Sequence, residues 1–123
     1  MTINGTERVT TISSDYGTNA VAPDGQDYLL VEVTFANASQ APQSVDPESA
    51  MVVDDTGSMY GMDYEALMTA DSEDALYSEV NPGGSVDMRV PFLVGEDTRI
   101  TQAHMTGVWD GGQFVVVDFD EAV

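Results

Sequence analysis

The sequence contains no cysteine and no lysine, and its basic residues are Arg8, Arg89 and Arg99. Without cysteine the chain cannot form disulfides, thiolate nucleophiles or cysteine-ligated metal sites. Three arginines against 22 acidic residues give a formal net charge of −19, so the basic surface that phosphate contacts require is missing. We therefore expect no binding to nucleic acid, and the same shortage of bases disfavours an anionic membrane surface.

Long apolar runs are also lacking. No stretch approaches the roughly 20 apolar residues that a membrane-spanning helix needs, so no membrane insertion is expected. The first residues, MTINGTERV, do not place a basic region before an apolar one, so we expect no signal peptide there.

The remaining composition is typical of a folded protein. Its 42% hydrophobic content, with nine Tyr or Phe and one Trp, argues against disorder, and 123 residues fit one domain, residues 1–123, with a core at about 6–119. The acid excess indicates a salt-adapted source, because at about 1 M salt the Debye length falls to roughly 3 Å and neighbouring carboxylates repel weakly. The alternative is an ordinary acidic protein from a high-GC organism that avoids lysine.

Alternating apolar and polar residues predict strands separated by turns. The clearest strand is Tyr28–Ala36, in which Leu29, Val31, Val33 and Phe35 share one face. Its other face begins apolar and becomes polar. We expect a central strand that has one face in the core and a far end that emerges into solvent.

Further strands are expected at 8–13, 50–53, 85–94, 98–109 and 113–119, with a hairpin return at 58–62 and a helical turn within 63–80. Pro91 cannot donate to a ladder, which indicates an edge strand or a bulge at that position. About seven strands predict an all-β fold, an immunoglobulin-like two-sheet antiparallel sandwich without the disulfide of antibody domains.

Four segments follow one another in a familiar order: GQDYLLVEVTFAN, MVVDDTGSMY, VNPGGSVDMRVPFLV and GQFVVVDF. With them the chain resembles the telokin-like family known as domain of unknown function 4352, over roughly residues 6–119. The resemblance implies a secreted or lipid-anchored immunoglobulin-like sandwich of prokaryotes, located outside the cell or in the cell envelope, with no established reaction. Members often carry a lipid-attachment cysteine, and such an anchor would lie outside this sequence.

Acidic residues crowd the turn Asp54–Ser58. Asp54 and Asp55, with Asp63 and Glu65 nearby, are a candidate cation site. Calcium needs about six to eight converging oxygens, and the pattern of an EF-hand is not met. The alternative is a simple turn, in which Gly57 supplies a positive φ.

Methionine and tyrosine gather in the next stretch, at Tyr60, Met62, Tyr64, Leu67 and Met68. Both residue types are frequent at binding surfaces, because methionine adapts its shape and tyrosine combines apolar area with a polar tip. We interpret the five as a contact surface for an unknown protein partner or for self-association. Core packing is the alternative.

Two N-glycosylation patterns begin at Asn4 and Asn37, and the second also reads as a turn that ends a strand. His104 stands beside Met105, but one such pair lacks the further ligands of a copper site. No catalytic constellation stands out, so we expect no enzyme, no cofactor and no metal centre.

The leading hypothesis is therefore a non-enzymatic, extracytoplasmic immunoglobulin-like domain, a protein-binding or cell-envelope module of a halophilic prokaryote. A second hypothesis is a structural subunit of a repeated assembly, such as a virion, pilus or surface layer, which would associate through edge strands like the one bearing Pro91. A third is a cation-binding module.

Overall fold

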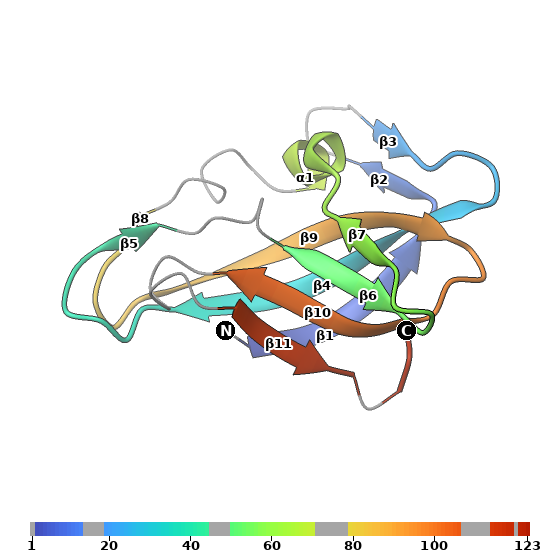
Figure 1. The fold of residues 1–123 in the computed structure, drawn as a ribbon. Coiled ribbons are helices and arrows are strands. Elements are labelled where there is room, and N and C mark those ends of the chain that lie inside the picture. Colours follow the sequence, from blue (N-terminus) through green and yellow to red (C-terminus); the bar gives the residue numbers. More distant parts are fainter. Residues whose placement is uncertain (1, 14–18, 45–49, 71–78, 107–113, 120) are drawn as a thin grey trace.

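The computed structural model describes residues 2–13, 19–44, 50–70, 79–106, 114–119 and 121–123. Figure 1 shows its strands and its short helix in chain order. The elements are β1 (Thr2–Val9), β2 (Thr11–Ser13), β3 (Asn19–Val21), β4 (Gln26–Ala36), β5 (Gln43–Ser44), β6 (Met51–Asp54), β7 (Met59–Gly61), α1 (Tyr64–Ala70), β8 (Glu79–Val80), β9 (Ser85–Gly95), β10 (Ile100–Thr106) and β11 (Phe114–Asp118).

Seven of these strands form the two main antiparallel sheets. One sheet has the order β1-β4-β9 and the other the order β11-β10-β6-β7. In chain order the first, second and fifth of the seven share one sheet, and the other four share the second. This is the A-B-E and G-F-C-C′ arrangement of immunoglobulin-like sandwiches, so the predicted fold is confirmed. The small pairs β2-β3 and β5-β8 are additions to it.

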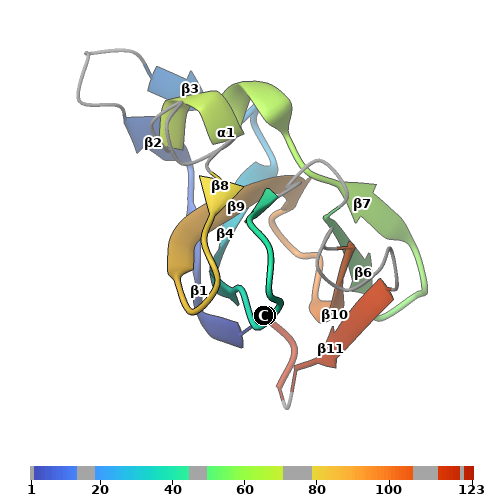
Figure 2. The same cartoon turned by 90° about the vertical axis from the view of Figure 1, so that its left-hand side faces the viewer.

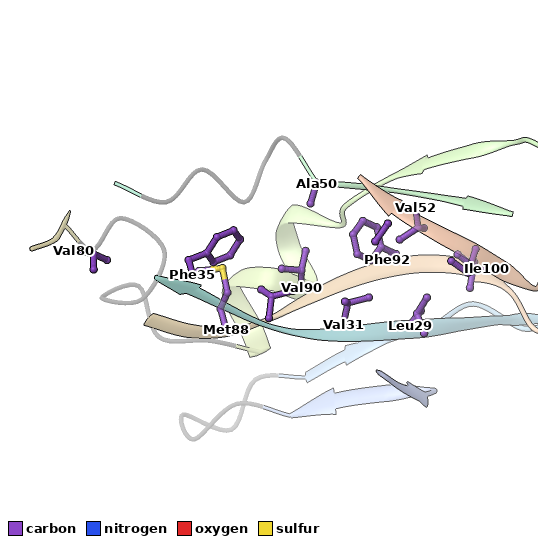
Figure 3. Packing of buried hydrophobic residues seen from close by; sticks show 13 residues of the cluster. Leu29, Val31, Phe35, Ala50, Val52, Val80, Met88, Val90, Phe92 and Ile100 are labelled. Carbon is purple, nitrogen blue, oxygen red and sulfur yellow. The ribbon is translucent and has the colours of Figure 1, made fainter. Parts of the chain in front are cut away.

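The main core lies between the two sheets. Leu29 and Val31 of β4 stand opposite Phe92 and Val90 of β9, and all four are buried. Figure 3 shows that these side chains point from the three-stranded sheet toward Val52 and Ile100 of the facing sheet. The period-two pattern of the sequence thus places one face of β4 and one face of β9 in a shared core.

The outer face of β4 changes character along the strand, as the sequence predicts. Tyr28 and Leu30 are buried there, whereas Glu32 is exposed. The apolar end is covered by a layer of three elements, the β2-β3 pair and α1, which lie together above the sheet in Figures 1 and 2. A second apolar cluster fills the space beneath them. It consists of Ile12, Tyr28, Leu30 and Ala66, with Val9, Ala20, Ala22 and Leu93 packed against it.

The strand expected at 8–13 is divided in the structure. β1 begins earlier, at Thr2, and pairs with β4 as far as Val9, after which the chain leaves the sheet and forms β2. The predicted hairpin return and helical turn are confirmed as β7 and α1. Residues 107–109, at the end of another expected strand, lie outside the described residues.

Pro91 lies on an edge strand, as its missing N–H predicts. β9 is the outer strand of the three-stranded sheet, and Pro91 pairs with Leu30 of β4 on its inner side. The carbonyl of Pro91 accepts a 2.9 Å hydrogen bond from the backbone N–H of Asp63, and the Pro91 side chain is fully buried. The edge of β9 is therefore covered at this point by the chain that leads into α1.

Arg8 links β1 to the turn between β9 and β10 and to Val123. Its Nη1 donates to the carbonyl of Gly95 at 3.1 Å, and its Nη2 donates to the carbonyls of Thr98 and, at 3.0 Å, Val123. Asp27 adds an ion pair of 3.6 Å. One guanidinium thus holds the turn between β9 and β10 together with the final residue of the chain.

Candidate functional site

The segment 59–64 links the two sheets along one side of the sandwich. It begins as β7, an edge strand of the four-stranded sheet, and ends at α1 beside the edge strand β9. Asp63 fastens its far end twice. The backbone N–H donates to Pro91, and Oδ1 accepts a 3.1 Å hydrogen bond from the N–H of Ala66, which caps the helix.

The large side chains of this segment are shared between core and solvent. Tyr60 and Met62 are half-buried and pack against the main core. Met59 and Tyr64 are 50% and 45% exposed, which places them among the most exposed large apolar side chains of the described residues. We call Met59, Tyr60, Met62 and Tyr64 the bridge surface.

The structure corrects the predicted contact surface at Leu67. This side chain is fully buried, because α1 turns Tyr64 toward solvent and Leu67 toward the protein. Helical spacing alone could group the two residues but could not tell which side faced the core. The Met68 side chain lies outside the described part of the structure. Met59, which the sequence analysis did not single out, takes the place of Leu67.

Beside this segment, the carboxylate of Asp54 accepts hydrogen bonds from residues of its own turn. Oδ1 accepts from the Thr56 N–H at 2.9 Å, the Thr56 hydroxyl at 2.6 Å and the Ser58 N–H at 2.9 Å. Oδ2 accepts a 2.8 Å hydrogen bond from the Tyr60 hydroxyl. These bonds, the one from the Thr56 hydroxyl above all, outweigh the effect of burial and lower the pKa of Asp54 from 3.8 to about 2. The same contact with Asp54 raises the pKa of Tyr60.

The structure therefore corrects the predicted cation site at Asp54, Asp55, Asp63 and Glu65. Asp54 is occupied by its turn, and Asp63 caps α1. Across the described ranges, no three acidic or histidine side chains converge in a group that could hold a metal ion. The alternative interpretation as a turn is confirmed, with Gly57 at a φ of 88°.

Asn37 is also corrected as a glycosylation site. It is 2% exposed, and its Nδ2 donates to the carbonyls of Ala41 at 2.9 Å and Val80 at 2.7 Å. Its Oδ1 accepts from the N–H and the hydroxyl of Ser39. Because both amide hydrogens are engaged and the side chain is enclosed, folded protein cannot present Asn37 to a glycosyltransferase. The alternative interpretation, a turn that ends the strand, agrees with these contacts.

Asn4 is different, since it lies exposed on β1. Its Nδ2 donates to Thr34 Oγ1 at 2.7 Å, and the Thr34 hydroxyl donates to Asp87 at 2.5 Å. Glycosylation at Asn4 stays a prediction. A shallow depression of about 320 Å³ opens here on the polar half of the outer face, lined by Asn4, Glu32, Val33, Asp87, Met88 and Arg89.

His104 occupies a half-buried position on β10. Its Nε2 lies 3.1 Å from Gln102 Oε1. The Met105 side chain lies outside the described residues. In the described part of the chain no helix has the length and apolar character needed to cross a bilayer.

The family model of DUF4352, a domain of unknown function, matches residues 1–118. The chain belongs to the DUF4352 family. A search of curated proteins finds no match.

Solved structures share the fold of this DUF4352 domain. A conserved hypothetical protein from Bacillus anthracis is 17% identical, with a TM-score of 0.67 over 99% of this chain and 84% of its own. YcdA of Bacillus subtilis, provisionally described as a lipoprotein, is 22% identical, with a TM-score of 0.65 over 97% of this chain and 35% of its own. A β-sandwich protein from Clostridium difficile is 15% identical, with a TM-score of 0.57 over 97% of this chain and 83% of its own. At these identities the likeness concerns the fold alone.

Proposed function

We propose that this DUF4352 domain is a non-enzymatic binding module of the cell envelope of a salt-adapted prokaryote, and that it contacts a protein partner through the bridge surface. The observation that carries the proposal is the joint exposure of Met59 and Tyr64, 50% and 45%, on the segment that links the two sheets. Tyrosine and methionine are enriched at protein interfaces, where rigid or adaptable apolar area is needed.

The surroundings of the bridge surface indicate the chemistry of the partner. Asp55 and Glu65 are exposed close to it in sequence, and Asp63 is half-buried within it. An apolar centre with acidic neighbours is complementary to a protein surface that has an apolar patch and a basic or neutral rim. Because the chain carries a net charge of −19, a second acidic surface would be repelled unless salt screened the charges.

The envelope location is supported by a structural relative. YcdA, whose fold this chain shares, is provisionally described as a lipoprotein, and the chain spans 35% of its length. The telokin-like grouping and the extracellular setting expected from the sequence belong to the same proposal. Fractionation of source cells with an antibody against the domain tests it, and recovery only with soluble cytoplasmic proteins would contradict it.

Salt adaptation is supported by the distribution of charge. Exposed carboxylates occur on many of the described elements and turns, among them Glu32, Asp55, Asp87, Glu96 and Asp97. The chain has three arginines to set against 22 acids, and Arg8 is directed mainly at backbone carbonyls. Mobile cations from the medium would then supply the screening that fixed bases supply in other proteins.

The two alternatives from the sequence find less support. Assembly through the edge strand bearing Pro91 meets an edge that Asp63 already covers at that position. A cation-binding module would need converging acidic groups, which the described residues do not form. Protein binding through the bridge surface is therefore the function that we retain.

Affinity capture with matched variants tests the bridge surface. Immobilised wild-type domain is incubated with an envelope extract of the source organism in molar potassium chloride, then compared with the double variant Met59→Ser, Tyr64→Ser. Neither side chain is buried, so the fold should be kept, unlike after truncation of Tyr60, whose hydroxyl contacts Asp54. We expect a partner that wild-type protein retains and that the double variant loses at least about tenfold, since hot-spot truncations commonly cost this much.

Val21→Ser serves as the control, because Val21 is 65% exposed but lies on β3. The control should retain the partner. Equal retention by all three proteins would reject the bridge surface. Recovery of the same chain as its own partner would show self-association instead.

A further inference from the structure

The three-stranded sheet separates two apolar clusters that lie on its opposite faces. Leu29 and Val31 of β4 point into the main core, whereas Tyr28 and Leu30 point into the second cluster. The main core is therefore complete without the layer of β2, β3 and α1. Loss of that layer would leave the ladders of β4 with β1 and β9 intact.

The elements of this layer are short. β2 and β3 have three residues each and pair with one another in a two-stranded sheet, and α1 has seven residues. A helix or hairpin of this length is not stable alone in water. Packing on the outer face of the sheet must therefore hold the layer in place.

Fewer large side chains hold the layer than fill the main core. The layer contributes Ile12 to the second cluster and also buries Leu67 of α1, while its other members of that cluster are Ala20, Ala22 and Ala66. Each alanine buries only a methyl group, so it contributes much less transfer free energy than a leucine or a phenylalanine. The main core, in contrast, contains large, fully buried side chains such as Phe92 and Leu29.

We propose that β2, β3 and α1 open together as one cooperative unit while the sandwich stays folded, which uncovers Tyr28 and Leu30 on the outer face. Units of this kind open at a smaller free energy than the whole domain. The inference concerns the domain alone. If the proposed function also holds, opening separates Tyr64 on α1 from Met59 on β7, so partner binding and closure of the layer are linked.

Native-state hydrogen exchange by NMR, in molar potassium chloride with increasing denaturant, tests this proposal. The reporters are the amides of Leu67 and Ala22, which donate to the carbonyls of Asp63 and Thr10. We expect both to exchange through one opening, with a shared denaturant dependence that is measurable and smaller than that of the amides in β4. A dependence equal to that of β4 would overturn the proposal, and so would separate, denaturant-independent exchange at each amide, which is local fraying.

A pair of variants gives a second, independent test. Val52→Ala weakens the main core, which is intact in both the closed and the open state, so it should speed exchange in β4 at least about tenfold and leave Leu67 and Ala22 unchanged. Ile12→Ala weakens the closed state alone and should speed the reporters in the layer about tenfold or more. If Val52→Ala speeds the layer as much as β4, the layer opens only when the sandwich unfolds. Binding plays no part in either experiment, so a failed capture assay would leave the outcome unaffected.

Discussion

The hydroxyl of Tyr60 donates a 2.8 Å hydrogen bond to Oδ2 of Asp54, so a residue of the bridge surface rests on the carboxylate that organises the turn between β6 and β7. Asp54 is 7% exposed and already accepts three hydrogen bonds on its other oxygen. The hydrogen bond to the turn therefore fixes the position of the Tyr60 side chain within the bridge surface. Pre-ordered aromatic side chains bind with a smaller loss of conformational entropy.

The Asp54 carboxylate should make stability depend on pH. Its pKa in the folded protein, about 2, lies below the ordinary value of 3.8, so ionised Asp54 stabilises the folded state. This contribution is complete above about pH 5 and is lost as the pH falls through 3.8 toward 2. We expect Asp54→Asn to be less stable than wild type at neutral pH, with a difference that shrinks in acid.

Urea unfolding of both proteins in molar salt, at several pH values, measures that difference. Asp55→Asn is the matched control, because Asp55 is exposed in the same turn. A gap between wild type and Asp54→Asn that stays constant down to about pH 2 would contradict the assignment.

Asn37 should be a stabilising residue. Asn37→Ala removes the donor for the Val80 carbonyl, 43 positions away in the chain, and leaves polar groups unsatisfied in a buried turn. We expect a loss of about 3 kcal/mol in the free energy of unfolding. Asn37→Asp keeps the acceptor but loses both donors, so it should be nearly as harmful. Denaturant unfolding measures both, with the exposed Asn4→Ala as a control that should change little.

The stabilisation that the Arg8 hydrogen bonds provide should be nearly independent of salt concentration. Its hydrogen bonds to Gly95 and Thr98 end on neutral backbone carbonyls, which salt screens much less than it screens an ion pair. Arg8→Ala should lower the free energy of unfolding by about 2 kcal/mol in both dilute and molar potassium chloride. Arg8→Lys should restore only part of this, because an ammonium cannot span the carbonyls as a planar fork does. A cost that disappears in molar salt would assign the stabilisation to the ion pair with Asp27.

The stability of the domain as a whole, unlike the contribution of Arg8, should depend on salt. With a net charge of −19, the melting temperature should rise by several degrees or more from dilute buffer to molar potassium chloride. A variant that neutralises the exposed Asp55, Glu96 and Asp97 as Asn, Gln and Asn should be more stable in dilute buffer and show a shallower rise. Scanning calorimetry at fixed pH measures both slopes. A melting temperature that ignores added salt would contradict salt adaptation.

Local patterns were enough to predict most of the main strands, although β1 begins at Thr2 and not at residue 8. Apolar and polar residues alternate clearly in β4 and β9. The change on the outer face of β4 from apolar at Leu30 to polar at Glu32 could be read directly from the sequence. The edge position of Pro91 also followed from one missing N–H. These features depend on period and backbone chemistry, both of which are local.

The errors concern three-dimensional contacts that residue spacing does not reveal. Helical spacing grouped Leu67 with Tyr64 but did not reveal that α1 would pack against β9, β2 and β3 and that Leu67 would be buried. The sequence at Asn37 fits a glycosylation site, yet the carbonyl of Val80 that occupies its amide comes from a strand far along the chain. The acids around Asp54 suggested a cation site. The sequence did not reveal that the hydroxyl of Tyr60, on the returning strand of the hairpin, donates a hydrogen bond to Oδ2 of Asp54.

The covered position at Pro91 has a consequence for neighbouring copies of the domain. Proline offers no N–H there, and its carbonyl already serves Asp63, so an approaching strand finds neither a donor nor a free acceptor. A ladder started elsewhere along β9 would be interrupted at that residue. Neighbouring molecules would thus not form a continuous intermolecular sheet along the β9 edge.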